Sequence, residues 1–132
     1  MTQEQKDLLL KDLCCRLPYG VKVQTTYINP QTKERKDIGT DVLSTVEISM
    51  LIDGYEEHKP YLFHLSSMTD EQKKEYRKVC ELDTERLSKH PMDGTPFPAL
   101  YNSQDWLSKN HFDYRGLIPM DLGIDATGLN IY

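Results

Sequence analysis

Apolar residues near the start of the chain recur at the spacing of an amphipathic helix. The pattern runs from Leu9 to Leu17, where a Pro-Tyr-Gly turn stops it. Thr2 and Gln5 match the capping box that often begins a helix. We therefore expect the first helix at about residues 3–16.

The apolar pattern then changes to period two, which is typical of half-buried strands. It predicts strands at residues 21–27, 42–52 and 60–65, and the proline in the third segment argues for a strand start or a sheet edge. Polar links join the three segments. Three successive strands with such links indicate an antiparallel meander.

A second capping box, Thr69 with Gln72, predicts a helix to about Ser88. Its apolar stripe is narrow, so we expect it to lie across one face of the sheet with much of its charge in solvent. Residues 90–102 contain three prolines and a glycine, which predicts an irregular passage.

A short helix is expected from Ser103 to near His111, with Asn110 as a left-handed residue at its end. The apolar tail that follows is too rich in large side chains for a disordered terminus, so we expect it to wrap back onto the domain.

Length and composition fit one folded domain. The chain has 132 residues, of which 38% are hydrophobic, enough to bury a core. We predict a single α+β domain over residues 1–132, with a helix-sheet-helix body at 1–89, a proline-rich passage at 90–102, and a C-terminal helix with an ordered tail at 103–132.

The formal charge of −5 disfavours direct nucleic-acid binding, because a polyanion would be repelled by the average field. The three cysteines, Cys14, Cys15 and Cys80, fit no disulfide framework, which predicts reduced thiols and a cytoplasmic location. No apolar run is long enough to span a membrane, so no membrane association is expected.

One bend places a histidine beside a carboxylate. His111 could act as a general base if Asp113 oriented it toward a pocket. We favour the alternative that Asp113 caps the bend, Arg115 pairs with a nearby carboxylate and His111 packs. The other His, Cys, Ser and Gly positions match no metal, nucleophile or phosphate-loop pattern, so no catalytic residue, metal or cofactor is predicted.

The favoured function is a non-enzymatic protein–protein interaction module. Aromatic and arginine side chains carry most interface energy. The candidate interaction residues lie together in the C-terminal stretch: Trp106, His111, Phe112, Asp113, Tyr114 and Arg115. The partner is an unknown protein, and a homodimer stays open because the tail could pack on its own domain or on a second copy.

Two other functions stay open. An acidic surface could imitate phosphates and inhibit or regulate a nucleic-acid-acting enzyme, although a solvated sheet face is the simpler interpretation. Its residues would be Asp41, Glu47, Asp53, Glu56 and Glu57. The third function is a small enzyme with a site near His111 and Asp113.

Three runs of the chain resemble a family of short uncharacterised proteins from gut anaerobic bacteria and their phages. They are LLLKDLCCRLPYGVKV at 8–23, KPYLFHLSSMT at 59–69 and WLSKNHFDYRGLIPMDLGIDATGLNIY at 106–132. The segments 29–57 and 81–102 are where such chains differ. The resemblance brings no established activity. It implies a mobile-element or accessory context, which favours a small adaptor or host-interaction protein.

Overall fold

The first strand lies in the middle of the sheet, not at its edge. The computed structural model describes residues 1–89 and 102–132. In it, β1 (Lys22–Ile28) pairs antiparallel with β2 (Arg35–Val42) on one side and β3 (Glu56–His64) on the other. The α+β class is confirmed, but the order β2-β1-β3 differs from the predicted meander. Two short C-terminal strands, β4 (Phe112–Asp113) and β5 (Ile124–Asp125), pair parallel with β3.

The strand predicted at residues 42–52 is wrong, because most of that segment forms the helix α2 (Thr45–Asp53). Ser44 begins this helix with a capping box, in which the Glu47 carboxylate accepts the Ser44 N–H at 3.0 Å. Gly54, with a φ of 81°, supplies the left-handed residue that ends the helix. The apolar positions of this segment fit the period of a strand and that of a helix alike, and the capping box of Ser44 with Glu47 indicates the helix.

The third strand is longer than predicted and contains its proline. It begins at Glu56, whereas the sequence suggested a start near Pro60. Pro60 lies opposite Val23 of β1, and the next residue, Tyr61, lies opposite Ile124 of β5. The missing N–H of Pro60 is tolerated because β3 changes partner at this point.

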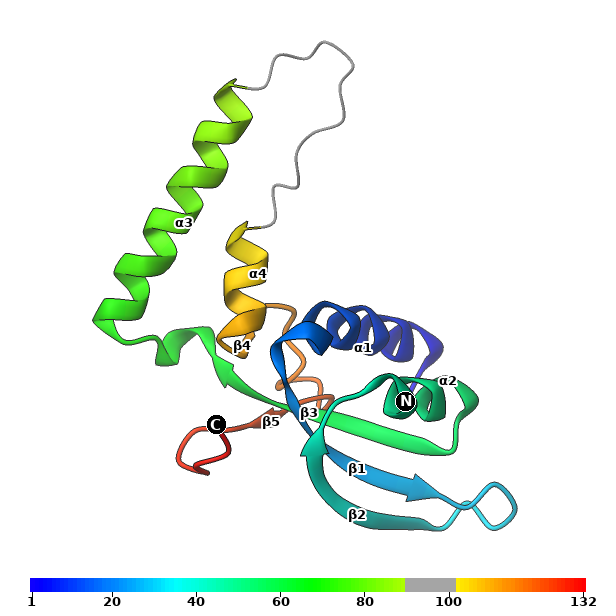
Figure 1. Ribbon diagram of the computed structural model, residues 1–132. Coiled ribbons are helices and arrows are strands. Elements are labelled where there is room, and N and C mark those ends of the chain that lie inside the picture. Colours follow the sequence, from blue (N-terminus) through cyan, green and yellow to red (C-terminus); the bar gives the residue numbers. More distant parts are fainter. Residues whose placement is uncertain (90–101) are drawn as a thin grey trace.

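The predicted first helix is confirmed as α1 (Gln3–Arg16), with its capping box, and a 3₁₀ turn, η1 (Leu17–Tyr19), follows it. Figure 1 shows α1 and α2 on the same side of the sheet. The main core lies between these helices, β1, β3 and the C-terminal segment. It consists of Leu9, Leu13, Val21, Val23, Leu43, Leu51, Leu62, Leu117 and Leu122.

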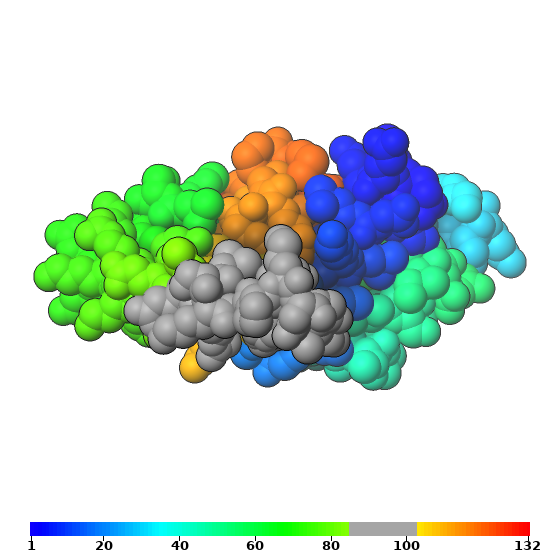
Figure 2. Space-filling model, turned by 90° about the horizontal axis from the view of Figure 1, so that it is seen from above, coloured from blue at the N-terminus to red at the C-terminus, as the bar shows by residue number. Residues whose placement is uncertain are grey.

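After a second 3₁₀ turn, η2 (Leu65–Ser67), the predicted third helix is present as α3 (Asp70–Lys89), and the capping bonds between Thr69 and Gln72 are confirmed. Its predicted position across the sheet is wrong, because α1 and α2 already cover the apolar face. Instead α3 packs on α4 (Asn102–Lys109) and extends away from the sheet (Figure 1). Seen from above, α3 lies at the opposite end of the molecule from the loop between β1 and β2 (Figure 2). A second core cluster joins them, with Trp106, Leu107 and Phe112 against Met68, Tyr76 and Val79.

The start of α4 differs from the prediction by one residue. Ser103 lies inside the helix, and its N–H donates to the Asp83 carboxylate of α3 at 2.9 Å. The left-handed residue after the helix is His111, with a φ of 63°, and not Asn110. The passage predicted at 90–102 falls, apart from Asn102, outside the described residues.

The C-terminal tail wraps back onto its own chain, as predicted. The Tyr132 hydroxyl donates to the carbonyl of Tyr61 at 2.8 Å and accepts the N–H of Lys22 at 2.9 Å. The Lys22 ammonium also donates to the Ile131 carbonyl at 2.7 Å. These bonds hold the tail against β1 and β3.

Candidate functional site

Two of the aromatic residues expected as surface anchors lie inside the molecule. Trp106 is 8% exposed and Phe112 is 2% exposed. Their rings stack nearly parallel with centroids 5.8 Å apart, and the Trp106 Nε1–H donates to Glu75 at 3.1 Å. Packing accounts for both side chains, so neither presents a face to a partner in this conformation.

Tyr114 and Arg115 belong to a network of charges with the first helix. The Asp12 carboxylate accepts from Nε of Arg16 at 2.7 Å and from Nε of Arg115 at 3.2 Å. Both guanidinium groups lie over the Tyr114 ring, at 5.0 and 4.9 Å from its centroid. Arg16 also donates to the Phe112 carbonyl at 2.7 Å. This network fastens α1 to the C-terminal bend.

Sequence reasoning missed the two buried members of that network. Asp12 and Arg16 are both fully buried. Their signal was a pair of opposite charges four residues apart, interrupting the apolar face that carries Leu9 and Leu13. A pair of opposite charges on the apolar side of a helix predicts that another segment of the chain packs over the pair and buries it.

The carboxylate of Asp113 is committed to the bend, as the favoured interpretation predicted. It accepts the N–H groups of Leu117 and Ile118, both at 2.9 Å. These bonds stabilise the chain where it turns after β4. The geometry therefore assigns Asp113 to the bend and not to the orientation of His111.

His111 is half-buried and stacks on Tyr132, with ring centroids 3.7 Å apart. Burial, assisted by the positive charge of Arg16, lowers the pKa of His111 to about 4. The imidazole is therefore neutral at pH 7. Its ring serves to hold the tail.

The acidic residues expected on one sheet face are divided among three places, because residues 45–53 form a helix. Asp53 is exposed at the end of α2. Glu57 forms an ion pair with Arg35, the first residue of β2. The remaining three line one hollow: Asp41, Glu47 and Glu56.

This acidic hollow, of about 250 Å³, lies between β2 and α2. Its other lining residues are Thr25, Ile38, Gly39 and Thr40. All titratable groups that line it are acids. Burial tends to raise the pKa of Glu47, but hydrogen bonds from Ser44 lower it overall, so this carboxylate is charged at neutral pH.

A buried histidine contacts two walls of the acidic hollow. His58 Nδ1 lies 3.0 Å from the Thr25 hydroxyl, and Nε2 lies 3.2 Å from Glu56, outside hydrogen-bond alignment. Burial lowers the pKa of His58, although the negative charges of Glu56 and Glu47 act to raise it. At neutral pH the imidazole therefore adds no positive charge to the hollow. No pattern in the sequence predicts this contact.

β2 forms the outer edge of the described sheet, and each of its eight residues is exposed. The edge contains a bulge at Ile38, because Asp37 lies opposite Thr26 and Gly39 lies opposite Thr25. Ile38 is 60% exposed. The outer side of β2 is open in Figure 1. Such an edge can hydrogen-bond to an added strand.

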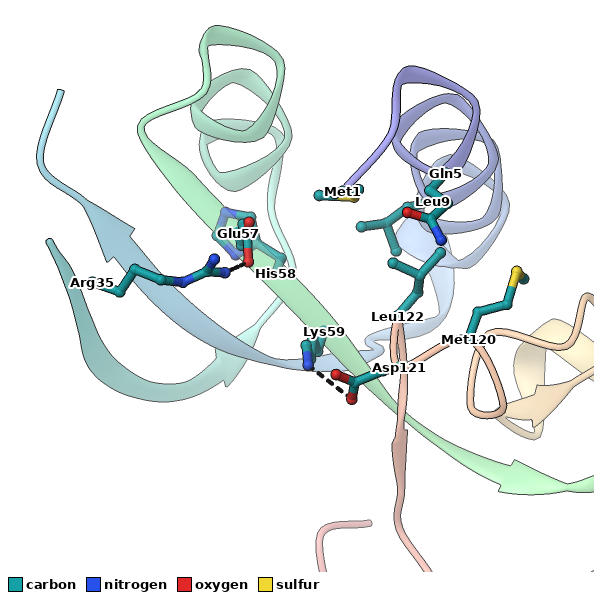
Figure 3. A pocket seen from close by; sticks show the side chains of 10 residues that line it. All are labelled: Met1, Gln5, Leu9, Arg35, Glu57, His58, Lys59, Met120, Asp121 and Leu122. Carbon is teal, nitrogen blue, oxygen red and sulfur yellow. Dashed lines mark hydrogen bonds and ion pairs between the residues drawn. The ribbon is translucent and has the colours of Figure 1, made fainter. Parts of the chain in front are cut away.

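A second hollow, of about 220 Å³, lies between the start of α1, β3 and the segment before β5 (Figure 3). Lys59 and Asp121 form an ion pair of 3.0 Å at its rim, and Arg35 pairs with Glu57 nearby. Its apolar wall consists of Met1, Leu9, Met120 and Leu122. Because the charged groups satisfy one another, this hollow offers less specific recognition than the acidic one.

Within residues 1–89 and 102–132, no group of three or more His, Cys, Asp or Glu is placed to hold a metal ion. No helix in the same ranges is long and apolar enough to cross a membrane. The three cysteines carry free thiols. Comparisons with protein-family models, curated proteins and solved structures gave no match to this chain.

Proposed function

We propose that this chain is a non-enzymatic protein–protein interaction module that binds its partner along β2. The observation that carries the proposal is the outer edge itself, a strand of eight consecutive exposed residues with one bulge. The outward backbone groups of such an edge are available to an added strand, apart from the Val42 N–H, which donates to the Asp41 carboxylate at 2.8 Å. A partner strand would continue the sheet beyond β2.

Side chains beside the edge support specific recognition. Ile38 is 60% exposed and Val46, at the start of α2, is 67% exposed. The acidic hollow lies on the helix-covered side of the same edge. Apolar side chains favour burial by a partner, and the carboxylates favour a partner that brings a basic side chain.

The proposal keeps the function class that the sequence suggested and moves the contact surface from the aromatic bend to β2. The cytoplasmic location and the mobile-element or phage-related context belong to the same proposal and rest on the cysteines and on the resemblance. The small-enzyme alternative loses its support, because Asp113 is committed to the backbone of the bend.

A photo-crosslinking residue at position 38 tests the proposal in cells that make the protein. We expect a covalent adduct from position 38 and none from position 82, where Leu82 is 52% exposed on α3. Excess unlabelled native chain should compete for the adduct, and a chain carrying Ile38→Lys should compete poorly. Equal labelling from both positions, or none from position 38, would refute the proposal.

A second candidate is an acidic inhibitor of a nucleic-acid-acting enzyme. It is favoured by the convergence of three carboxylates on one hollow. Asp41→Lys should abolish inhibition of the target enzyme, whereas Asp53→Lys, the same charge change outside the hollow, should leave it intact. Added salt should also weaken inhibition. Equal effects of the two substitutions would indicate a diffuse charge effect and exclude the hollow as the site.

A further inference from the structure

The outer edge of β2 is complementary to itself. We propose that the strand added to β2 is β2 of a second copy of this chain, antiparallel and related by a twofold axis at Ile38 and Gly39. This inference rests on the function proposed above, because it names the partner of the same edge. The faces on which the β2 side chains lie favour this pairing.

The bulge places Lys36 and Asp41 on the same face of the sheet. Lys36 lies opposite Tyr27, and Asp41 lies opposite Val23. Val23 and Tyr27 are alternate residues of β1 and share one face, and Val23 belongs to the core on that face. Residues five apart in a regular strand would lie on opposite faces. Because Ile38 is an extra residue in β2, Lys36 and Asp41 share one face, and both charges lie on the side of the sheet covered by the helices.

In an antiparallel pair centred on the bulge, Lys36 of each copy stands opposite Asp41 of the other. The remaining pairs then join side chains on the face of the sheet away from the helices. They are Asp37 with Thr40 and Arg35 with Val42. A shift of one residue would oppose side chains from different faces, which antiparallel pairing does not allow. The bulge therefore selects one register, and that register contains two opposite-charge pairs.

The acidic hollow provides the electrostatic reason for this register. Asp41 lines the hollow together with Glu47 and Glu56, and Lys36 is exposed. An incoming Lys36 would meet Asp41 at the rim of a hollow whose titratable groups are all acids. At the axis, the Ile38 side chains of both copies, each 60% exposed, would lose contact with water.

Sedimentation equilibrium of the full chain, from about 1 µM to about 1 mM at low salt, tests the proposal. We expect a concentration-dependent dimer. Lys36→Glu or Asp41→Lys should each raise the dissociation constant about tenfold or more, because each change puts two like-charge pairs across the axis. Lys33→Glu, the same charge change in the β1–β2 loop, should leave dimerisation unchanged.

Mixing the two weakened variants provides the decisive control. In a mixed dimer of Lys36→Glu and Asp41→Lys chains, both cross-strand contacts join opposite charges, so the mixture should dimerise more tightly than either variant alone. The double variant should also recover the dimer. Restored pairing shows that the single variants are folded, and circular dichroism checks this independently.

The proposal is overturned if the native chain stays monomeric over the whole range, if the single variants dimerise like the native chain, or if mixing restores nothing. A monomeric chain whose position 38 crosslinks to a different protein would refute the second copy and leave the interaction module standing. A monomeric chain with no adduct from position 38 would refute both.

Discussion

The carboxylate of Asp12 lies 2.7 Å from Nε of Arg16, and both side chains are fully buried. The same carboxylate lies 3.2 Å from Nε of Arg115, so one carboxylate forms ion pairs with two guanidinium groups. The face of the Tyr114 ring lies against both guanidinium groups and supplies further negative potential. The C-terminal bend is therefore held to α1 by charge as well as by apolar packing.

Asp12→Ala should lower the free energy of unfolding by about 3–5 kcal/mol, because it leaves two arginines without their counter-ion in the interior. Urea denaturation at pH 7 measures the change. Asp7→Ala removes an exposed acid from the same helix and should stay within about 0.5 kcal/mol of the native chain. A cost at position 12 as small as that at position 7 would contradict the role given to the network.

The lowered pKa of His111 makes stability depend on pH. The folded chain keeps this imidazole neutral down to about pH 4, whereas the unfolded chain binds a proton near pH 6.5. Between these values the unfolded state holds more protons, so stability falls as the pH falls. The lowered pKa of His58 acts in the same direction.

The His111 contribution is measurable with His111→Asn, since asparagine tolerates the φ of 63° at this position. The full shift corresponds to about 3 kcal/mol, which solvent screening of the half-buried ring reduces to roughly 1–2 kcal/mol. From pH 7 to pH 4.5 the native chain should lose that much more stability than the variant. An NMR titration midpoint of His111 near pH 6.5 would contradict this.

The elements that sequence predicted well are those with a capping box and one clear period. The helices beginning after Thr2 and Thr69 combine both signals. At residues 45–53 the apolar positions fit period two and the helical period alike, and only Ser44 with Glu47 distinguishes them. β2 was missed because an edge strand exposed on both faces has no apolar alternation.

Ser44→Ala tests whether a helix begins at Ser44. Loss of the hydroxyl cap and of its bond to Glu47 should lower the free energy of unfolding by about 1 kcal/mol. Ser49→Ala, at an exposed position of the same helix, should cost almost nothing or stabilise slightly, since alanine is the better helix former. Indistinguishable urea midpoints for the two variants would argue against a helix that begins at Ser44.

The acidic residues were predicted as a set, but their arrangement was beyond the sequence. Asp41, Glu47 and Glu56 meet because a strand, a helix and a second strand converge, and Asp53 is excluded because it lies at the far end of that helix. The buried contact of His58 with Thr25 depends on the register of β1 and β3. Register follows from tertiary pairing, which local periodicity does not specify.

Trp106 and Ile38 separate a packing role from a surface role. Trp106 is 8% exposed and touches the rings of Tyr76 and Phe112, so Trp106→Ala should cost about 3–5 kcal/mol of folding stability. Ile38 is 60% exposed, so Ile38→Ala should change stability by no more than about 0.5 kcal/mol. Urea denaturation measures both.

Binding should show the opposite order under conditions where both variants are folded. Ile38→Ala should weaken strand addition at β2, because the side chain it shortens lies at the centre of the proposed contact. Trp106→Ala should bind like the native chain once the folded fraction is taken into account. Binding that is lost at Trp106 in a fully folded variant, and kept at Ile38, would return the interface to the C-terminal bend.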